Sequence, residues 1–391
     1  MNADLNSLDR WKGAAERWLP KIRTMYEDLH RIPELSLKEY KTTEYICSKL
    51  REMNIEPHKA DLTGCYAWLG PEVGPVLALR ADIDGLPVAE ETGLEYASTH
   101  EGQMHACGHD GHMAILLGVA GILKEMEKEC PVRVKLIFQA SEENAQGAAR
   151  LIEKGILNDV DRIFGVHLFS DIPTGLVSLE DGPRMAQTDR FEVTFYGKGG
   201  HAAKPHLCTD ATLMAAEYVT LLQSVVARET NPAEAAVVSV GSLHSGNQYN
   251  IISGEARMEG TCRCYSGEMS GLLEEGLRRR AEGIAACHGG KAELVYQSAC
   301  HPPVVNDPEM TTAIRNVAEA FLGKKAFGSV KPLLLGEDFS WYQSRIPGVF
   351  AFVGCGKPDQ PVWPNHHCRF RIDENAFLYG VFLHLSAVLG V

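Results

Sequence analysis

Apolar residues recur at helical spacing between Trp18 and Leu50, and the pattern is interrupted at Pro33, which predicts two helices. A second helical pattern runs from Met113 to Lys124. Around it lie short apolar runs that predict strands, at Val76–Leu79, Val132–Phe138, Arg162–Leu168 and Gly175–Leu179. This alternation of strands and helices predicts an α/β architecture with a largely buried sheet.

The pattern changes after Met185. It predicts, in order, a strand at Phe191–Tyr196, a helix at Ala211–Arg228, strands at Ala236–Val240 and Ala256–Cys264, a helix at Ser270–Cys287 and a strand at Ala292–Gln297. Such a βαββαβ order forms a compact sandwich with its helices on one face of the sheet. The last third restarts with a helix at Asp307–Phe321 and an apolar run at Val349–Gly354. We therefore expect a larger domain of residues 1–186 and 299–391, interrupted by an inserted domain of residues 187–298.

A length of 391 residues fits this two-domain division. The formal net charge of −13 disfavours nucleic acids and acidic membrane surfaces as partners, since both need a basic surface, although such a charge is also compatible with solubility alone. No apolar run reaches the length of a membrane span, so a soluble protein is expected.

The N-terminal segment MNADLNSLDRWKGAAERW is polar and helix-like, and it lacks the pattern of a secretory signal. The 11 cysteines are an odd number spread through a long chain, which favours free thiols in a reducing compartment over a disulfide framework. Both features predict a cytoplasmic protein.

The densest group of chemically active side chains is HACGHDGH, which contains His105, Cys107, His109 and His112 between a predicted strand and a helix. Loops at strand ends are where α/β enzymes assemble their sites. Thiolate and imidazole are good ligands for borderline-soft divalent metals, and the i, i+2 spacing of Cys107 and His109 directs both side chains to one side of an extended chain. Histidines in glycine-rich turns are also often ordinary surface residues, so this motif alone leaves both interpretations open.

Adjacent carboxylates follow the apolar strand in LIFQASEEN, at Glu142 and Glu143. A solvated turn would explain such a pair. A metallohydrolase, however, needs two different carboxylates, one bound to metal and one free to accept a proton from water. Adjacent positions can divide these roles.

Two further histidine signals lie at strand ends or loops. His167 in FGVHLF could be a core histidine with its hydrogen bonds satisfied, and His366 and His367 in NHHC could belong to a polar turn. Taken together with the two preceding motifs, these residues supply enough thiolate, carboxylate and imidazole groups for two metal ions with open positions for water and substrate.

These residues and their surroundings resemble the M20 metallopeptidases, within them the aminoacylase and amidohydrolase branch that includes hippurate hydrolases, indole-acetyl-amino-acid hydrolases and N-acetyl-diaminopimelate deacetylases. The resemblance extends over nearly the whole chain and rests on the ordered motifs LHRIPELSLKE, LRADIDGLPVAEETGL, MHACGHDGHMAILLG, FQASEENAQGA, FGVHLF, GKGGHAAKPH, YNII, GTCR, GEDF and a final His before FRIDE. It implies a zinc-peptidase-like catalytic domain with a mixed central sheet, interrupted by an inserted βαββαβ lid or dimerisation domain.

The resemblance also implies roles for individual residues. The metal ligands would be Cys107, His109, Glu143, His167 and His366, with Cys107 bridging two ions. Glu142 matches the general base of the family. His201, in GKGGHAA, matches a histidine that helps to stabilise the oxyanion, often in the active site of the partner subunit. Asn250 and Arg263 match positions that tend to contact the substrate carbonyl and carboxylate.

The chain departs from the family pattern in three places. Relatives usually have Pro-Ala before the two glutamates, where this chain has Ala140 and Ser141. They usually have Asn-Val-Ile-Pro where this chain has Asn-Ile-Ile-Ser, with Ser253 in the place of the proline. The loss of this proline can alter the wall of the substrate pocket. Of the doubled histidines, we assign His366 as the ligand, because its distance to Phe370 and Asp373 fits the family.

The predicted function is metal-dependent hydrolysis of the amide bond of N-acyl amino acids or related conjugates, with two divalent ions per subunit. Thiolate and imidazole suit zinc, whereas carboxylate and water tolerate manganese, cobalt or nickel. The alternative within enzymes is a dipeptidase or carboxypeptidase with the same metals. A non-catalytic protein that stores or senses metal is a different class, and it would not need Glu142.

The expected partners are a small-molecule substrate and a second copy of the chain. An exposed edge strand in the inserted domain could pair with its copy in two-fold fashion, which predicts a homodimer through residues 187–298. The sequence leaves open whether His201 acts within its own chain or in the partner.

Overall fold

The computed structural model describes residues 5–391, so the first four residues of the polar N-terminal segment lie outside the described residues. The chain divides into two compact units. The larger unit runs up to Arg184 and resumes at Val305–Lys331 and Asp338–Val391, and the smaller unit comprises Met185–Val304 and Pro332–Glu337.

The larger unit contains a seven-stranded sheet in the order β1-β2-β4-β3-β5-β15-β6. Its strands are β1 (Pro57–Lys59), β2 (Cys65–Leu69), β3 (Val76–Asp82), β4 (Arg133–Gln139), β5 (Arg162–Pro173), β6 (Val177–Ser178) and β15 (Gly348–Gly356). The four central strands β4, β3, β5 and β15 pair in parallel, while β1, β2 and β6 join antiparallel. The mixed central sheet predicted for this fold is therefore confirmed. Two further short strands, β7 (Gly182–Met185) and β14 (Val304–Asn306), pair with each other.

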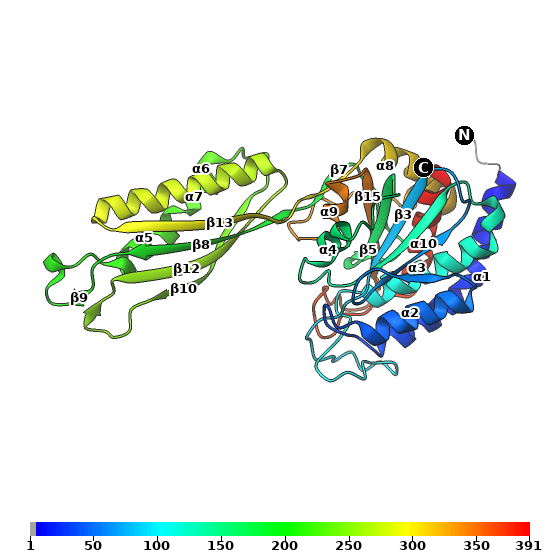
Figure 1. Ribbon diagram of the computed structural model, residues 1–391, viewed down its shortest axis with the longest axis horizontal. Coiled ribbons are helices and arrows are strands. Elements are labelled where there is room, and N and C mark those ends of the chain that lie inside the picture. Colours follow the sequence, from blue (N-terminus) through cyan, green and yellow to red (C-terminus); the bar gives the residue numbers. More distant parts are fainter. Residues whose placement is uncertain (1–4) are drawn as a thin grey trace. The chain divides into compact units, whose positions relative to one another are not determined.

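The helices of this unit are α1 (Leu5–His30), α2 (Tyr40–Glu52), α3 (His109–Glu125), α4 (Gly147–Glu153), α8 (Pro308–Leu322), α9 (Ser340–Gln343) and α10 (Ala376–Gly390). The long helix α3 is buried from His109 to Leu123 and packs between the sheet and α1 (Figure 1). Among residues 5–391, no helix combines the length and the apolar character needed to cross a membrane.

The two faces of the sheet differ in polarity, because successive side chains of a strand point to opposite faces. On β3, Leu77, Leu79 and Ala81 belong to the main apolar core. The intervening Arg80 faces the opposite side, where its guanidinium lies 5.9 Å from the ring centroid of Phe339. Successive strand residues point to opposite faces, so one short strand contributes both to the core and to a buried polar network.

The smaller unit contains a four-stranded antiparallel sheet in the order β10-β12-β8-β13. Its elements are β8 (Gln187–Tyr196), β9 (Gly200–His201), α5 (Ala211–Leu221), α6 (Gln223–Glu229), β10 (Val237–Ser245), β11 (Ile251–Ile252), β12 (Glu255–Cys264), α7 (Gly267–His288) and β13 (Lys291–His301). The helices lie together on one face of the sheet, over a separate apolar core (Figure 1). The edge strands are β10 and β13.

The helix predicted at Ala211–Arg228 is wrong as one element, because the structure has two helices that meet at Leu222. Hydroxyl groups near the junction donate hydrogen bonds to helix carbonyls: Thr220 to Ala216 at 3.1 Å and Ser224 to Leu221 at 2.6 Å. Such bonds from serine and threonine compete with the backbone ladder and bend helices.

His30, at the end of α1, is buried between Asp110 at 2.6 Å and Glu90 at 3.1 Å. Burial lowers the pKa of His30, but the hydrogen bonds to these two carboxylates outweigh it and raise the pKa to about 9. An unfolded histidine releases its proton near pH ~6.5. The stabilisation is therefore complete below that pH and is lost as the pH rises through about 9.

We expect the free energy of unfolding to fall by roughly 3 kcal/mol across this window, as measured by denaturant unfolding at a series of pH values. The variant His30→Gln should lose most of this slope because it has no proton to release. An unchanged slope in the variant would assign the pH dependence to a different group.

Candidate metal centre

The polar residues of the larger unit gather at one edge of its sheet. The parallel strands β3 and β4 end there at the same level, as the pairing of Asp82 with Gln139 shows, and the neighbouring strand β5 continues past them. The segment with Glu142 and Glu143 follows β4, and His167 lies on β5. The carboxyl ends of parallel strands are where α/β proteins place their sites.

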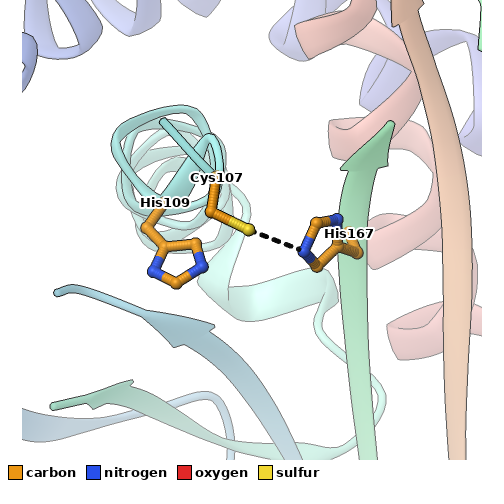
Figure 2. Close-up of side chains that lie close together, drawn as sticks. All are labelled: Cys107, His109 and His167. Carbon is orange, nitrogen blue, oxygen red and sulfur yellow. Dashed lines mark hydrogen bonds between the residues drawn. The ribbon is translucent and has the colours of Figure 1, made fainter. Parts of the chain in front are cut away.

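Cys107 and His109 reach this edge through a sharp turn. Gly108 between them has a φ of 90°, and a Cβ there would also lie 3.3 Å from the Phe370 ring, so the position favours glycine. His109 then begins α3. Figure 2 shows the Cys107 thiol pointing from this turn toward His167 on β5. The Sγ atom of Cys107 lies 3.5 Å from Nε2 of His167.

All five predicted ligands meet here, and Cys107 is common to two groups of them. In one group, ligand atoms of Cys107, His109 and His167 lie within 4.8 Å of one another. In the other, the same holds for Cys107, Glu143 and His366. In this second group, Nε2 of His366 is 3.2 Å from Sγ of Cys107 and 3.5 Å from Oε1 of Glu143. One shared thiol between two groups is the arrangement expected of a bridging ligand.

Backbone carbonyls orient two of the imidazoles. Nδ1 of His109 donates to the carbonyl of Asp84 at 2.9 Å, and Nδ1 of His167 donates to the carbonyl of Leu168 at 3.0 Å. In a neutral ring, donation from Nδ1 leaves the lone pair on Nε2. This is the usual way in which a protein fixes the tautomer of a metal-binding histidine.

The residues fit a metal because the site buries polar atoms without partners. Nε2 of His109 and Oε1 of Glu143 are buried, and neither atom has a hydrogen-bond partner among the described residues. The two atoms lie 3.8 Å apart, too far for a hydrogen bond between them. Burial raises the pKa of Glu143 to about 7, with the nearby carboxylates Asp84 and Asp82 acting in the same direction and His109 in the opposite one. Cations between these groups would satisfy the unpartnered atoms and offset the negative charge.

Of the two neighbouring histidines near the C-terminus, His366 is the one that faces Cys107. Its φ of 70° is unusual for a residue other than glycine. The turn is held by Asn365, whose Nδ2 donates to the carbonyls of Cys107 and Leu168, both at 3.0 Å. His367 instead stacks on Trp363, with ring centroids 4.5 Å apart.

The two other histidines of HACGHDGH lie outside the two groups that share Cys107, although His112 forms another group with Asp82 and His109. Both ring nitrogens of His112 are engaged, with Nδ1 2.6 Å from Asp82 and Nε2 accepting the Leu168 amide at 2.9 Å. His105 is buried, its pKa is lowered to about 4 by burial, and it lies in none of the ligand groups found among the described residues.

Glu142 lies beside the metal ligands but outside the two groups that share Cys107. Its carboxylate is within 4.8 Å of ligand atoms of His109 and Glu143. One buried carboxylate positions both glutamates: Asp84 accepts the backbone amide of Glu142 at 3.2 Å and that of Glu143 at 3.0 Å. The adjacent glutamates are thus held by their backbone, while their side chains take different positions.

Asp84 and Asn365 were missed as functional residues in the sequence. Asp84 could have been found by the signal that identified Glu142 and Glu143, because it also follows an apolar strand, in LRADIDG. Asn365 had no comparable signal, since a single asparagine before two histidines is typical of many polar turns.

In the smaller unit, His201 and Asn250 are neighbours. His201 on β9 pairs with Ile251 on β11, and the Ala202 amide donates to the Asn250 carbonyl at 3.1 Å. Nδ1 of His201 accepts the Ala203 amide at 3.0 Å, so the neutral ring carries its proton on Nε2 and can donate it from the exposed side. The side-chain oxygen of Asn250 is buried and has no hydrogen-bond partner among the described residues.

Arg263 lies at the other end of this unit from His201. Strand β12 begins at Glu255, next to the β9 and β11 pair, and Arg263 comes near its far end, opposite Thr188. At ~3.3 Å per residue, the separation along the strand is about 26 Å. Within one copy of the unit, the three predicted substrate-contacting residues therefore do not surround a common point.

The chain is similar to known proteins over nearly its whole length. Residues 78–389 match peptidase family M20/M25/M40. An N-acetyl-L-cysteine deacetylase from Bacillus subtilis is 41% identical over 92% of this chain and 85% of its own length. Thermostable carboxypeptidase 1 from Saccharolobus solfataricus is 33% identical, covering 94% of both chains. The crystal structure of a dinuclear metal-binding M20 peptidase from Bacillus subtilis has a TM-score of 0.84 and 37% identity, covering 96% of this chain and 99% of that one. On these matches, the chain belongs to peptidase family M20/M25/M40.

Proposed function

We propose that the protein hydrolyses the amide bond of N-acyl amino acids or closely related conjugates, using two divalent metal ions. The observation that carries this proposal is the shared thiol of Cys107 between two ligand groups, with the carboxylate of Glu142 beside them. The deacetylase that is 41% identical supports the N-acyl amino acid as the substrate class.

The ions would be held by Cys107, His109, Glu143, His167 and His366. When bound, they would supply Lewis-acid polarisation of the substrate carbonyl and a water of lowered pKa. Thiolate and imidazole favour zinc, and the carboxylate ligand also allows manganese, cobalt or nickel. The family relationship supports two ions per subunit. The types of ligand alone do not identify which metal is bound.

Glu142 would move the protons of the reaction. Its carboxylate accepts one proton from the attacking water as the water oxygen bonds to the amide carbon. It then delivers that proton to the amide nitrogen as the C–N bond breaks, which yields a carboxylic acid and a free amine. The backbone amides held by Asp84 keep Glu142 in place while its side chain exchanges the proton.

The competing enzymatic function is that of a carboxypeptidase or dipeptidase with the same metals. The thermostable carboxypeptidase among the relatives supports this alternative. A panel assay separates the two. After reconstitution with Zn²⁺ or Mn²⁺, we expect release of amine from N-acetyl amino acids, including N-acetylcysteine, at a kcat/KM higher than for dipeptides. Higher values for dipeptides would establish the peptidase instead.

We also propose a homodimer through the smaller unit. Its edge strand β10 and the exposed apolar side chains Leu243 and Ile251 support pairing with a second copy. The separation of His201 and Arg263 along the unit supports the same conclusion, because a small substrate touched by both would need them from different copies.

The 11 cysteines, all free thiols, support a cytoplasmic, reducing location.

The trans arrangement of His201 predicts complementation between inactive protomers. His201→Ala should lower turnover about 10²- to 10³-fold without changing the metal content, since it removes an oxyanion donor and no ligand. Mixing it with Glu142→Gln under conditions of subunit exchange should restore activity, because one hybrid site has both residues. If exchange is demonstrated and activity stays at the level of the separate variants, His201 does not act in trans.

A further inference from the structure

A continuous hydrogen-bonded chain runs behind the His167 side of the metal centre. Arg80 is buried and donates to Asp82 at 2.7 Å and to Asp338 at 2.9 Å. The other oxygen of Asp82 accepts Nδ1 of His112 at 2.6 Å, and Nε2 of His112 accepts the amide of Leu168 at 2.9 Å. The chain thus ends on the residue directly after His167.

The hydrogen bonds fix the state of His112. A backbone amide can only donate, so Nε2 of His112 must carry a lone pair and Nδ1 must carry the proton given to Asp82. Arg80 keeps the second oxygen of Asp82 occupied and holds the carboxylate as an acceptor. Burial lowers the pKa of His112, in agreement with a neutral ring.

His112 therefore holds the residue whose carbonyl orients His167. The backbone amide of Leu168 donates a hydrogen bond to His112, and the carbonyl of Leu168 accepts one from Nδ1 of His167 at 3.0 Å. The other group of ligands has further support: Asp84 accepts the backbone amide of Glu143, and Asn365 holds the turn of His366 through the carbonyl of Cys107 as well as that of Leu168. The hydrogen bonds of His112 reach neither of these two ligands.

We propose that His112 is a positioning residue for one of the two ion positions, the one formed by Cys107, His109 and His167, and that the position formed by Cys107, Glu143 and His366 depends on it less. This inference rests on the proposed two-ion site. It makes the two ion affinities separable by a residue that touches neither ion. Loss of such a supporting hydrogen bond typically weakens metal binding about 10- to 100-fold.

Calorimetric titration of the metal-free protein with Zn²⁺ tests the proposal without any activity assay. Reference variants His167→Ala and His366→Ala identify which of the two binding steps belongs to which position. In His112→Asn, the side-chain amide can replace Nδ1 toward Asp82 but cannot reach the Leu168 amide. We expect this variant to lose about 10- to 100-fold affinity in the His167 step and clearly less in the His366 step.

Two controls separate positioning from a general loss of stability. His112→Gln, whose longer side chain can present an acceptor near the place of Nε2, should retain more affinity in the His167 step than His112→Asn. His384→Asn changes another buried histidine, which hydrogen-bonds only within its own helix to Gly380 at 2.8 Å among the described residues, and should leave both steps unchanged.

The outcomes are distinct. If the wild-type protein binds fewer than two ions, the proposed two-ion site is wrong. If it binds two and His112→Asn weakens both steps equally, weakens neither, or weakens only the His366 step, the positioning role of His112 is wrong. An equal loss in His384→Asn would likewise overturn it, because the effect would then follow from any disturbance of the buried core.

Discussion

Replacing Glu142 by glutamine is expected to lower kcat about 10²- to 10⁴-fold, the usual contribution of a positioned general base. The amide cannot accept a proton from water, but it has almost the same shape and leaves both groups of metal ligands intact. Metal content and thermal stability should therefore stay close to those of the wild-type protein. Steady-state kinetics on an N-acetyl amino acid, together with elemental analysis, measure both quantities.

The matched control is the same substitution one residue further on. Glu143→Gln replaces a ligand carboxylate 3.5 Å from His366 and should lower the bound metal as well as the turnover. Turnover of Glu142→Gln near the wild-type value would show that the proton passes through another group. It would also be the result expected of a protein that only stores or senses metal.

The second large effect is expected from Cys107→Ala. Its thiol belongs to both ligand groups, so one substitution should weaken both ions, whereas His167→Ala and His366→Ala should each weaken mainly one. We expect less than one tightly bound ion per chain and a loss of activity of about 10³-fold or more, since loss of the metals removes both the activated water and carbonyl polarisation.

Elemental analysis after gel filtration measures this loss directly. Cys65→Ala is the control, because Cys65 is also buried in the larger unit but lies on β2 within the apolar core. If Cys107→Ala retains two ions per chain, Cys107 is not a bridging ligand. If Cys65→Ala loses metal to the same extent, the effect reflects damage to the core.

The central strands could be predicted from the sequence because each is a short, apolar run bounded by polar residues. Helix α10 was missed for the opposite reason: it is apolar and buried on nearly every side, so it shows no one-sided helical pattern. Strands β1 and β2 were missed too, and β1 consists of only three residues, two of them exposed. Helix α1 begins earlier than the pattern indicated and contains Pro20 in its interior.

The ligand positions could be predicted because their residue types are rare and lie in short motifs that resemble a known family. The roles of the supporting residues could not be predicted, because these roles depend on partners distant in sequence. Asp84 contacts an amide 58 positions away, and His112 contacts one 56 positions away. The left-handed backbone of His366 has no sequence signature either, since it is imposed by the packing of its turn.

The most direct test of the dinuclear hydrolase is a titration of the metal-free protein with Zn²⁺ or Mn²⁺, with hydrolysis of an N-acetyl amino acid measured at each step. The metal-free protein should be inactive, activity should rise until two ions are bound per chain, and amine and acetate should appear in equal amounts. Hydrolysis by the metal-free protein would contradict the account, and so would binding of two ions with no cleavage of any N-acyl amino acid or dipeptide.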